Sequence, residues 1–168
     1  MVPRCVPDVM KRLGILSLEI QRMPKQPGLM FFNPANAPQL SVVMPSTHDT
    51  STVRGWWEED REKTQQFFNG EMHHPGLAPY YCEPWVNKAI IIQHLYSPAL
   101  WSVFLLQDLM GMDGKIRREY PAEERINIPA VPKFYWRYRM HLTLEQLLQE
   151  DDFNNELRSY VQSSGRAG

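Results

Sequence analysis

The fold is best predicted from the segment LSVVMPSTHDTSTVRGWW, residues 40–57. Four of its first five residues are apolar, and two of these are valine, a pattern that predicts a buried strand over residues 40–44. Pro45 ends the run, and a polar turn follows in which His48 and Asp49 are adjacent. In parallel sheets the functional side chains lie just beyond the carboxyl ends of the strands. The stretch therefore predicts a sheet strand with a site at its end.

The flanking sequence predicts more elements of both kinds. We expect strands over residues 15–20 and 99–106, helices over 6–13, 50–69, 83–96 and 152–163, and a short helix opened by a capping box at 143–146. Strands alternating with helices predict an α/β fold with a parallel sheet covered on both faces. Three strands are too few for a closed (β/α)8 barrel, which takes about 250 residues. The chain is thus a small open sheet or the last part of a larger barrel.

Composition excludes several classes of protein. A formal net charge of −1 over 168 residues argues against nucleic-acid binding. No apolar run reaches the roughly 20 residues that span a bilayer, and the start at Met1 lacks the apolar core of a signal peptide. Cys5 and Cys82 are far apart and form no CxxC pair, which suits a reducing compartment. We expect no membrane partner and a cytoplasmic location.

Several chemistries could use His48 and Asp49. A serine hydrolase would need a nucleophile elbow such as GxSxG, which the sequence lacks. The other cluster of metal-binding residue types, His73 and His74 with Cys82, has the wrong spacing for zinc, so we expect no metal there. No glycine-rich phosphate loop is present.

A sugar site fits these residues better. Asp49 can stabilise the positive charge of an oxocarbenium-like transition state, and His48 can donate to a sugar hydroxyl. Equally open is a structural role, with Asp49 capping a helix and His48 packed. Trp56 is a weaker candidate for contact with a sugar, and it is more typical of core or groove wall.

Two other groups of polar residues are open to structural readings. Gln107 and Asp108 also follow a predicted strand, and they can either serve a site or cap the next helix. The acidic and basic residues between 117 and 125 have the composition of a solvated charged surface.

Longer strings resemble one family. SVVMPSTHDTSTVRGWWEE (41–59) is similar to the His-Asp-Thr region of the 4-α-glucanotransferases of glycoside hydrolase family 77, also called amylomaltases or disproportionating enzymes. VPDVMKRLGILSLEIQRMP (6–24) resembles the segment that follows that family's Glu-Asp-Leu-Gly motif, and SPALWSVFLLQDLMGMD (97–113) resembles its last barrel strand. ERINIPAVPKFYWRYRMHLTLEQLL (124–148) resembles its Asn-x-Pro…Trp-x-Arg signature, here Asn127, Pro129, Trp136 and Arg137.

The resemblance implies a (β/α)8 TIM barrel that transfers segments of α-1,4-glucan with retention, without cofactor or metal. Three carboxylates serve that reaction, and Asp49 aligns with the one that stabilises the transition state. His48 aligns with a histidine that contacts the same sugar ring. Asn127 and Trp56 are weaker candidates for substrate contact, and Trp136 and Arg137 are expected to pack the C-terminal segment.

The chain departs from the family in its extent. The family's nucleophile and acid/base lie earlier than any segment here, so residues 1–168 resemble the C-terminal portion of the barrel, about strands six to eight, with C-terminal helices. We expect no nucleophile or acid/base in this chain, little activity from it alone, and apolar strand faces left uncovered. Its partner would be the missing N-terminal part of the same enzyme. The alternative is a non-catalytic α-glucan-binding polypeptide or one half of a split enzyme.

Overall fold

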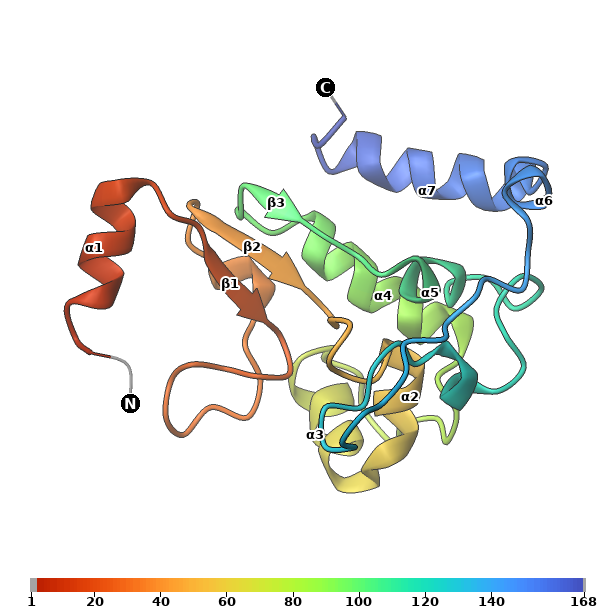
Figure 1. The fold of residues 1–168 in the computed structure, drawn as a ribbon, viewed down its shortest axis with the longest axis horizontal. Helices are drawn as coiled ribbons and strands as arrows, with labels where there is room; N and C mark the ends of the chain where they lie inside the picture. Colours follow the sequence, from red (N-terminus) through yellow and green to blue (C-terminus); the bar gives the residue numbers. More distant parts are fainter. Residues whose placement is uncertain (1–2, 168) are drawn as a thin grey trace.

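The computed structural model describes residues 3–167, which fold around a three-stranded sheet (Figure 1). The strands are β1 (Ser17–Ile20), β2 (Ser41–Met44) and β3 (Trp101–Ser102). They lie in the order β1-β2-β3, and both pairs are parallel. The predicted α/β class and parallel sheet are confirmed. Met1 and Val2, on which the expectation of no signal peptide partly rests, lie outside the described residues.

The third strand is shorter than the apolar run that predicts it. The Val103 N–H still donates to the Val43 carbonyl at 3.0 Å, but the chain then leaves the sheet. Helix α5 (Leu106–Met110) begins three residues after Val103, and Leu105 before it is in an extended conformation. A continuous apolar run does not show where a strand gives way to a buried helix.

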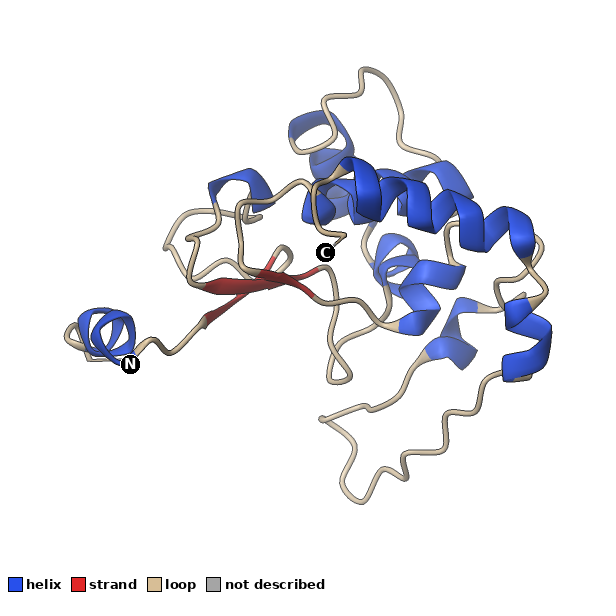
Figure 2. Cartoon of the chain, turned by 90° about the horizontal axis from the view of Figure 1, so that it is seen from above, coloured by secondary structure: helices blue, strands red, loops and turns tan. Residues whose placement is uncertain are grey.

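Helices cover one face of the sheet. Glu19 and Val43 are register partners whose side chains are buried on the same face of the sheet, which lies next to α4 (Pro84–Leu95), and Val43 packs there with Ala37, Ala99 and Phe32. The Ser102 hydroxyl on that face donates to the His94 carbonyl of α4 at 2.6 Å. Figure 2 shows the strands nearly edge-on, with helices gathered mainly on one side.

The other face remains open in the described part of the chain. Leu18, Val42 and Trp101 are aligned in register across the three strands. Leu18 and Trp101 are 44% and 57% exposed. The prediction of a sheet covered on both faces is therefore wrong for residues 3–167. The apolar character of the open face agrees with the expected uncovered barrel strands.

The helix predicted over residues 50–69 is two helices, α2 (Val53–Glu59) and α3 (Arg61–Gly70). Thr52 caps α2 by accepting from the Gly55 N–H at 3.2 Å. Asp60 separates the helices, and its carboxylate accepts from the N–H groups of Glu62 and Lys63 at 3.2 and 3.1 Å. A short polar side chain that caps the backbone competes with continuation of a helix.

The main core is aromatic and lies among α2, α3 and α4. Its buried members are Phe31, Val53, Trp56, Trp57, Phe67, Phe68, Ala78, Cys82, Val86 and Ile90. The rings of Phe31, Trp56, Trp57 and Phe67 meet edge to face at centroid distances of 5.0–6.4 Å. This cluster fixes α2, and with it the turn that precedes α2.

The remaining elements are short or peripheral. Helix α1 (Val6–Leu13) lies beyond the sheet and ends at Gly14, whose φ is 66°. Helix α6 (Leu144–Leu148) has the predicted capping box at Thr143 and Gln146, and α7 (Asp151–Ser163) packs on α4. Two 3-10 turns, η1 (Pro34–Asn36) and η2 (Pro121–Glu124), complete the fold. Across residues 3–167, the search for a helix long and apolar enough to cross a bilayer finds none.

One buried histidine in α4 makes the stability of the fold depend on pH. His94 is fully buried, its Nδ1 lies 2.8 Å from the Ile90 carbonyl, and burial lowers its pKa from 6.5 to about 4. The folded chain binds fewer protons than the unfolded chain between these values, so stability falls as pH decreases from about 6.5 towards 4. We expect this group to account for a loss of about 3 kcal/mol.

Urea unfolding at pH 7 and pH 4.5 measures this effect. The raised pKa of buried Asp108 acts in the opposite direction, since its neutral form is favoured by folding. The original chain is therefore compared with a His94→Phe variant. In the variant, the decrease in the free energy of unfolding between pH 7 and pH 4.5 should be smaller by most of the amount assigned to His94. An unchanged pH dependence in the variant would assign the effect to other groups.

Candidate active site

His48 and Asp49 lie in the turn that follows β2, at the carboxyl edge of the sheet. The turn is closed by the Thr50 N–H, which donates to the Thr47 carbonyl at 3.1 Å, and by the Asp49 N–H, which donates to the Thr47 hydroxyl at 3.2 Å. Both side chains are about half exposed, and His48 Nε2 lies 3.4 Å from Asp49 Oδ2. The structure thus places His48 and Asp49 just after a strand, as predicted.

Asn127 joins this pair from a distant part of the sequence. Its Nδ2 donates to Asp49 Oδ1 at 2.7 Å. The imidazole therefore faces one carboxylate oxygen and the amide binds the other. This arrangement orients a half-exposed carboxylate, which can accept from hydroxyl groups or stabilise a nearby positive charge.

Trp136 adds an apolar surface next to His48. The two ring centroids are 5.2 Å apart with an interplanar angle of 43°, and Trp136 is 57% exposed. An indole this exposed beside an imidazole is accessible to a ligand, and the expected packing of the C-terminal segment by Trp136 stays a prediction. An indole face is a suitable platform for the apolar face of a sugar ring.

Arg22, which follows β1, holds the turn in place. Its Nε donates to the Pro45 carbonyl at 3.0 Å, and its Nη2 donates to the Ser51 carbonyl at 2.7 Å and the Thr50 hydroxyl at 3.2 Å. Its guanidinium carbon lies 5.2 Å from the centroid of Trp56. Burial lowers the pKa of Arg22 to about 10, so it remains protonated at neutral pH.

Asp108 has a structural role at the start of α2. It is buried within α5, its Oδ1 accepts from the Val53 N–H at 2.8 Å, and its Oδ2 accepts from the Ser46 hydroxyl. Burial raises the pKa of Asp108. The carboxylate thus caps α2 instead of the helix that contains it, and it ties α5 to the turn after β2.

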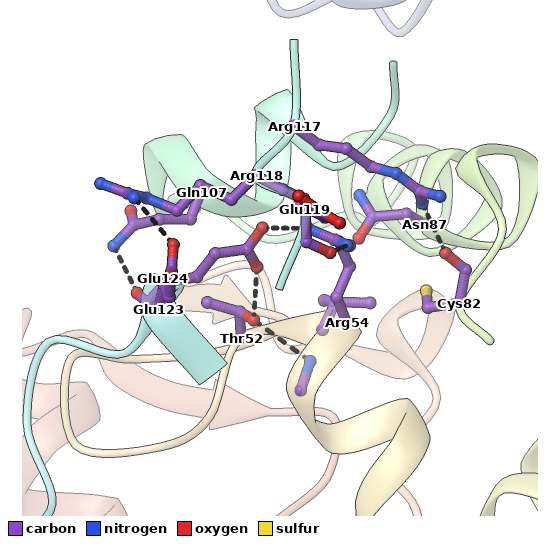
Figure 3. A network of polar contacts seen from close by, with 12 residues as sticks. Thr52, Arg54, Cys82, Asn87, Gln107, Arg117, Arg118, Glu119, Glu123 and Glu124 are labelled. Carbon is purple, nitrogen blue, oxygen red and sulfur yellow. Dashed lines mark hydrogen bonds and ion pairs between the residues drawn. The ribbon is translucent and has the colours of Figure 1, made fainter. Parts of the chain in front are cut away.

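A buried ion pair joins α2 to the segment that carries Asn127 (Figure 3). Arg54 Nη1 donates to Glu124 Oε1 and also to the Arg118 carbonyl at 2.8 Å. Glu124 accepts from the Thr52 hydroxyl at 2.9 Å, and its carbonyl accepts from Gln107 at 3.0 Å. Burial raises the pKa of Glu124, against the opposing effect of Arg54.

This pair corrects the interpretation of residues 117–125 as a solvated surface. Glu124 is 2% exposed and Arg54 is 4% exposed. Alternating charges indicate exposure only when no buried charge of opposite sign faces them, and Arg54 is 70 residues away in the sequence. The pair fixes η2 three residues before Asn127, so it positions the amide that binds Asp49.

A pocket of about 370 Å³ lies beside Asp49. Its lining includes Arg22, Trp56, Glu59, Lys63 and Arg125. Trp56 is 8% exposed and belongs to the aromatic core, so it contributes at most an edge to the pocket wall. Within residues 3–167, no group of three or more histidine, cysteine, aspartate or glutamate side chains is arranged to hold a metal ion.

The contacts of Arg22, Arg54 and Glu124 that support the candidate site were not predicted from the sequence. Arg22 follows a predicted strand just as His48 does, and carboxyl ends of parallel strands meet at one edge. That signal could have assigned Arg22 to the site. Nothing in the local sequence distinguishes Glu124 from its exposed neighbours.

The chain is similar to proteins of one family. The family model Glyco_hydro_77, described as 4-alpha-glucanotransferase, matches residues 1–144. The chain is 41% identical over 167 residues to 4-alpha-glucanotransferase DPE2 of Oryza sativa subsp. japonica, covering 99% of this chain and 18% of that protein. It is 30% identical to a 4-alpha-glucanotransferase of Chlamydia caviae, covering 91% of this chain and 29% of that protein.

The fold of the chain also matches part of a solved structure. The amylomaltase from Streptococcus agalactiae in complex with acarbose matches with a TM-score of 0.72 and 16% identity, over 100% of this chain and 31% of that chain. This chain therefore spans between about a fifth and a third of the length of these proteins.

Proposed function

This chain belongs to the 4-alpha-glucanotransferase family Glyco_hydro_77, and we propose that its His48 and Asp49 form part of the active site of an enzyme that transfers segments of α-1,4-glucan. The observation that carries the proposal is the hydrogen bond from Asn127 to Asp49 at 2.7 Å. It orients a carboxylate at the carboxyl edge of a parallel sheet, where such enzymes place their functional groups.

Each residue has a defined role in this proposal. Asp49 stabilises the oxocarbenium-like transition state and accepts from the hydroxyls of the sugar. His48 donates to the same sugar ring, and Asn127 holds the Asp49 carboxylate in the orientation that faces this ring. Trp136 provides an exposed aromatic surface beside His48, and Trp56 supports the wall from within the core.

The nucleophile and the acid/base belong, in this proposal, to an earlier part of the enzyme. A retaining reaction needs two carboxyl groups about 5–5.5 Å apart on either side of the bond that breaks. Residues 1–168 correspond to the C-terminal portion of the barrel, about strands six to eight. The open apolar face of the sheet and the partial coverage of the relatives support this assignment.

The chemistry assigned to these carboxylates uses no cofactor and no metal. Cys5 and Cys82 are free thiols, which is consistent with the cytoplasm as the compartment. The alternative function is a polypeptide that binds α-glucan without turnover or that assembles with a separate N-terminal polypeptide. The half-exposed His48 and Asp49 suit binding as well as catalysis.

A chimeric enzyme tests the proposal. The 168 residues replace the matching segment of the rice DPE2 protein, and transfer between maltodextrins is measured by release of glucose. We expect the chimera to be active and the isolated chain to be inactive, because the isolated chain has only one carboxylate of the set.

Two results would contradict this proposal. Glucose release by the isolated chain that disappears in Asp49→Asn would mean that the chain is complete as a catalyst. An inactive but folded chimera that binds maltodextrin would favour the binding alternative.

A further inference from the structure

A second pocket, of about 530 Å³, is formed by η2 and the loop that follows it. Its charged lining residues are Arg118, Glu123, Arg125, Lys133, Arg137 and Arg139. From Arg125 to His141 the sequence has four cations and no acidic residue. A concave surface lined by charges of one sign concentrates the field and attracts ions of the opposite sign.

Part of this positive charge is not neutralised within the described residues. Glu123 pairs with Arg118 at 3.1 Å, and Arg125 pairs with Glu59 at 3.5 Å. No ion pair within residues 3–167 involves Lys133, Arg137 or Arg139, and Arg139 donates only to the carbonyl of Tyr138. Three cations therefore remain for an external anion.

Polar atoms in the wall also lack partners. Arg118 Nε and the Tyr138 hydroxyl are buried and make no hydrogen bond within the part of the chain that the structure describes. Arg118 lies over the Tyr138 ring at 5.8 Å, and Arg137 lies over the Tyr135 ring at 5.2 Å. Arg118 uses Nη1 to donate to Glu123 and Nη2 to donate to the Arg139 carbonyl, so the stacked guanidinium that keeps its in-plane N–H groups available to an anion is that of Arg137.

We propose that this pocket binds a phosphate monoester. A dianionic tetrahedral group matches several guanidinium forks, which bind phosphate oxygens in pairs. The tyrosine rings suit the organic part of the ester. A nucleic acid is disfavoured, because the cations surround one pocket instead of following a stripe.

The pocket is adjacent to the Asp49 site. Arg125 lines both pockets, and its Nε donates to the carbonyl of Asn127 at 3.0 Å. The phosphate monoester therefore comes either from a small sugar phosphate or from a phosphate carried on an α-glucan that also reaches Asp49. The phosphate site itself does not depend on the proposed transferase activity.

Isothermal titration of the 168-residue chain tests the site, with glucose 6-phosphate, inorganic phosphate and glucose as probes. We expect glucose 6-phosphate to bind at least tenfold more tightly than glucose, with an affinity that decreases as salt is raised. The affinity for glucose 6-phosphate should fall at least tenfold in the double variant Lys133→Gln with Arg137→Gln. Both residues are exposed, so we expect the fold to be preserved.

The matched control is Lys11→Gln with Arg158→Gln, which removes the same two charge types from exposed positions on α1 and α7. It should leave the affinity unchanged. Equal binding of glucose and glucose 6-phosphate, or equal losses in the two double variants, would overturn the proposal. Circular dichroism of each variant checks that it is folded.

A second pair of probes separates the two sources. Phosphorylated maltoheptaose that binds at least tenfold more tightly than glucose 6-phosphate, with an advantage lost in Asp49→Asn, identifies a glucan. Equal affinities identify a small sugar phosphate. Loss of glucose 6-phosphate binding in Asp49→Asn would place the phosphate at the Asp49 site and overturn the assignment to this pocket. An inactive chimeric enzyme would contradict the proposed transferase function but would leave the phosphate site intact.

Discussion

Replacing Asp49 by Asn in the chimeric enzyme should lower kcat by about 10²–10³-fold, the range for removing one electrostatic group that stabilises a transition state. The substitution keeps an oxygen that can accept from Asn127, and both partners are at the surface, so the turn after β2 should remain folded. What it removes is the negative charge opposite the developing oxocarbenium ion. The positive charge on the sugar is absent from the ground state of the substrate. KM should therefore change far less than kcat.

Steady-state transfer between maltodextrins measures the effect, with Asp152→Asn as the matched control. Asp152 is an exposed acid in α7, and its replacement should leave kcat within about twofold. A decrease of less than about tenfold for Asp49→Asn would mean that Asp49 is not the stabilising carboxylate. An increase in KM with kcat unchanged would assign it to substrate binding alone.

The second large effect concerns stability. Glu124→Ala leaves the Arg54 guanidinium buried without its carboxylate, and breaking such a pair costs about 3–5 kcal/mol. Urea unfolding of the 168-residue chain should show a loss of this size. The variant should also weaken the hold on Asn127, because η2 is anchored to α2 through this pair.

The neighbouring acid provides the control. Glu123 pairs with Arg118 at 3.1 Å, but its side chain is 54% exposed, so Glu123→Ala should cost less than about 1 kcal/mol. Replacing both members, as Arg54→Met with Glu124→Leu, should recover part of the loss, because no buried charge then remains unpaired. Equal losses for Glu123→Ala and Glu124→Ala would show that the buried pair contributes no more than an exposed one.

The sequence predicted the parts of the fold that depend on local chemistry. The helix over 6–13, the helix that starts at Pro84 and the capping box at Thr143 are confirmed within one or two residues. The end of β3 and the break at Asp60 were missed. In both places a competition between two backbone partners decides the outcome, and residue type alone does not reveal it.

The site shows the same division. His48 and Asp49 were predicted from their position after a strand, and Asn127 was identified as a weaker candidate through resemblance. The contact between Asn127 and Asp49 spans 78 residues, and the pair of Arg54 and Glu124 spans 70. Such long-range contacts are set by the packing of α2 against η2, so they became visible only in the folded chain.

Helix α1 has a consequence for how stability is distributed along the chain. None of its eight residues is buried, so it is held by its backbone hydrogen bonds and by the cap at Gly14. A helix of this length is marginal in water without tertiary packing. Its amide hydrogens should therefore exchange with solvent through local opening, long before those around the fully buried Trp57, whose protection reports global unfolding. We therefore expect at least two cooperative units, so that a single midpoint of thermal denaturation would describe only the aromatic core.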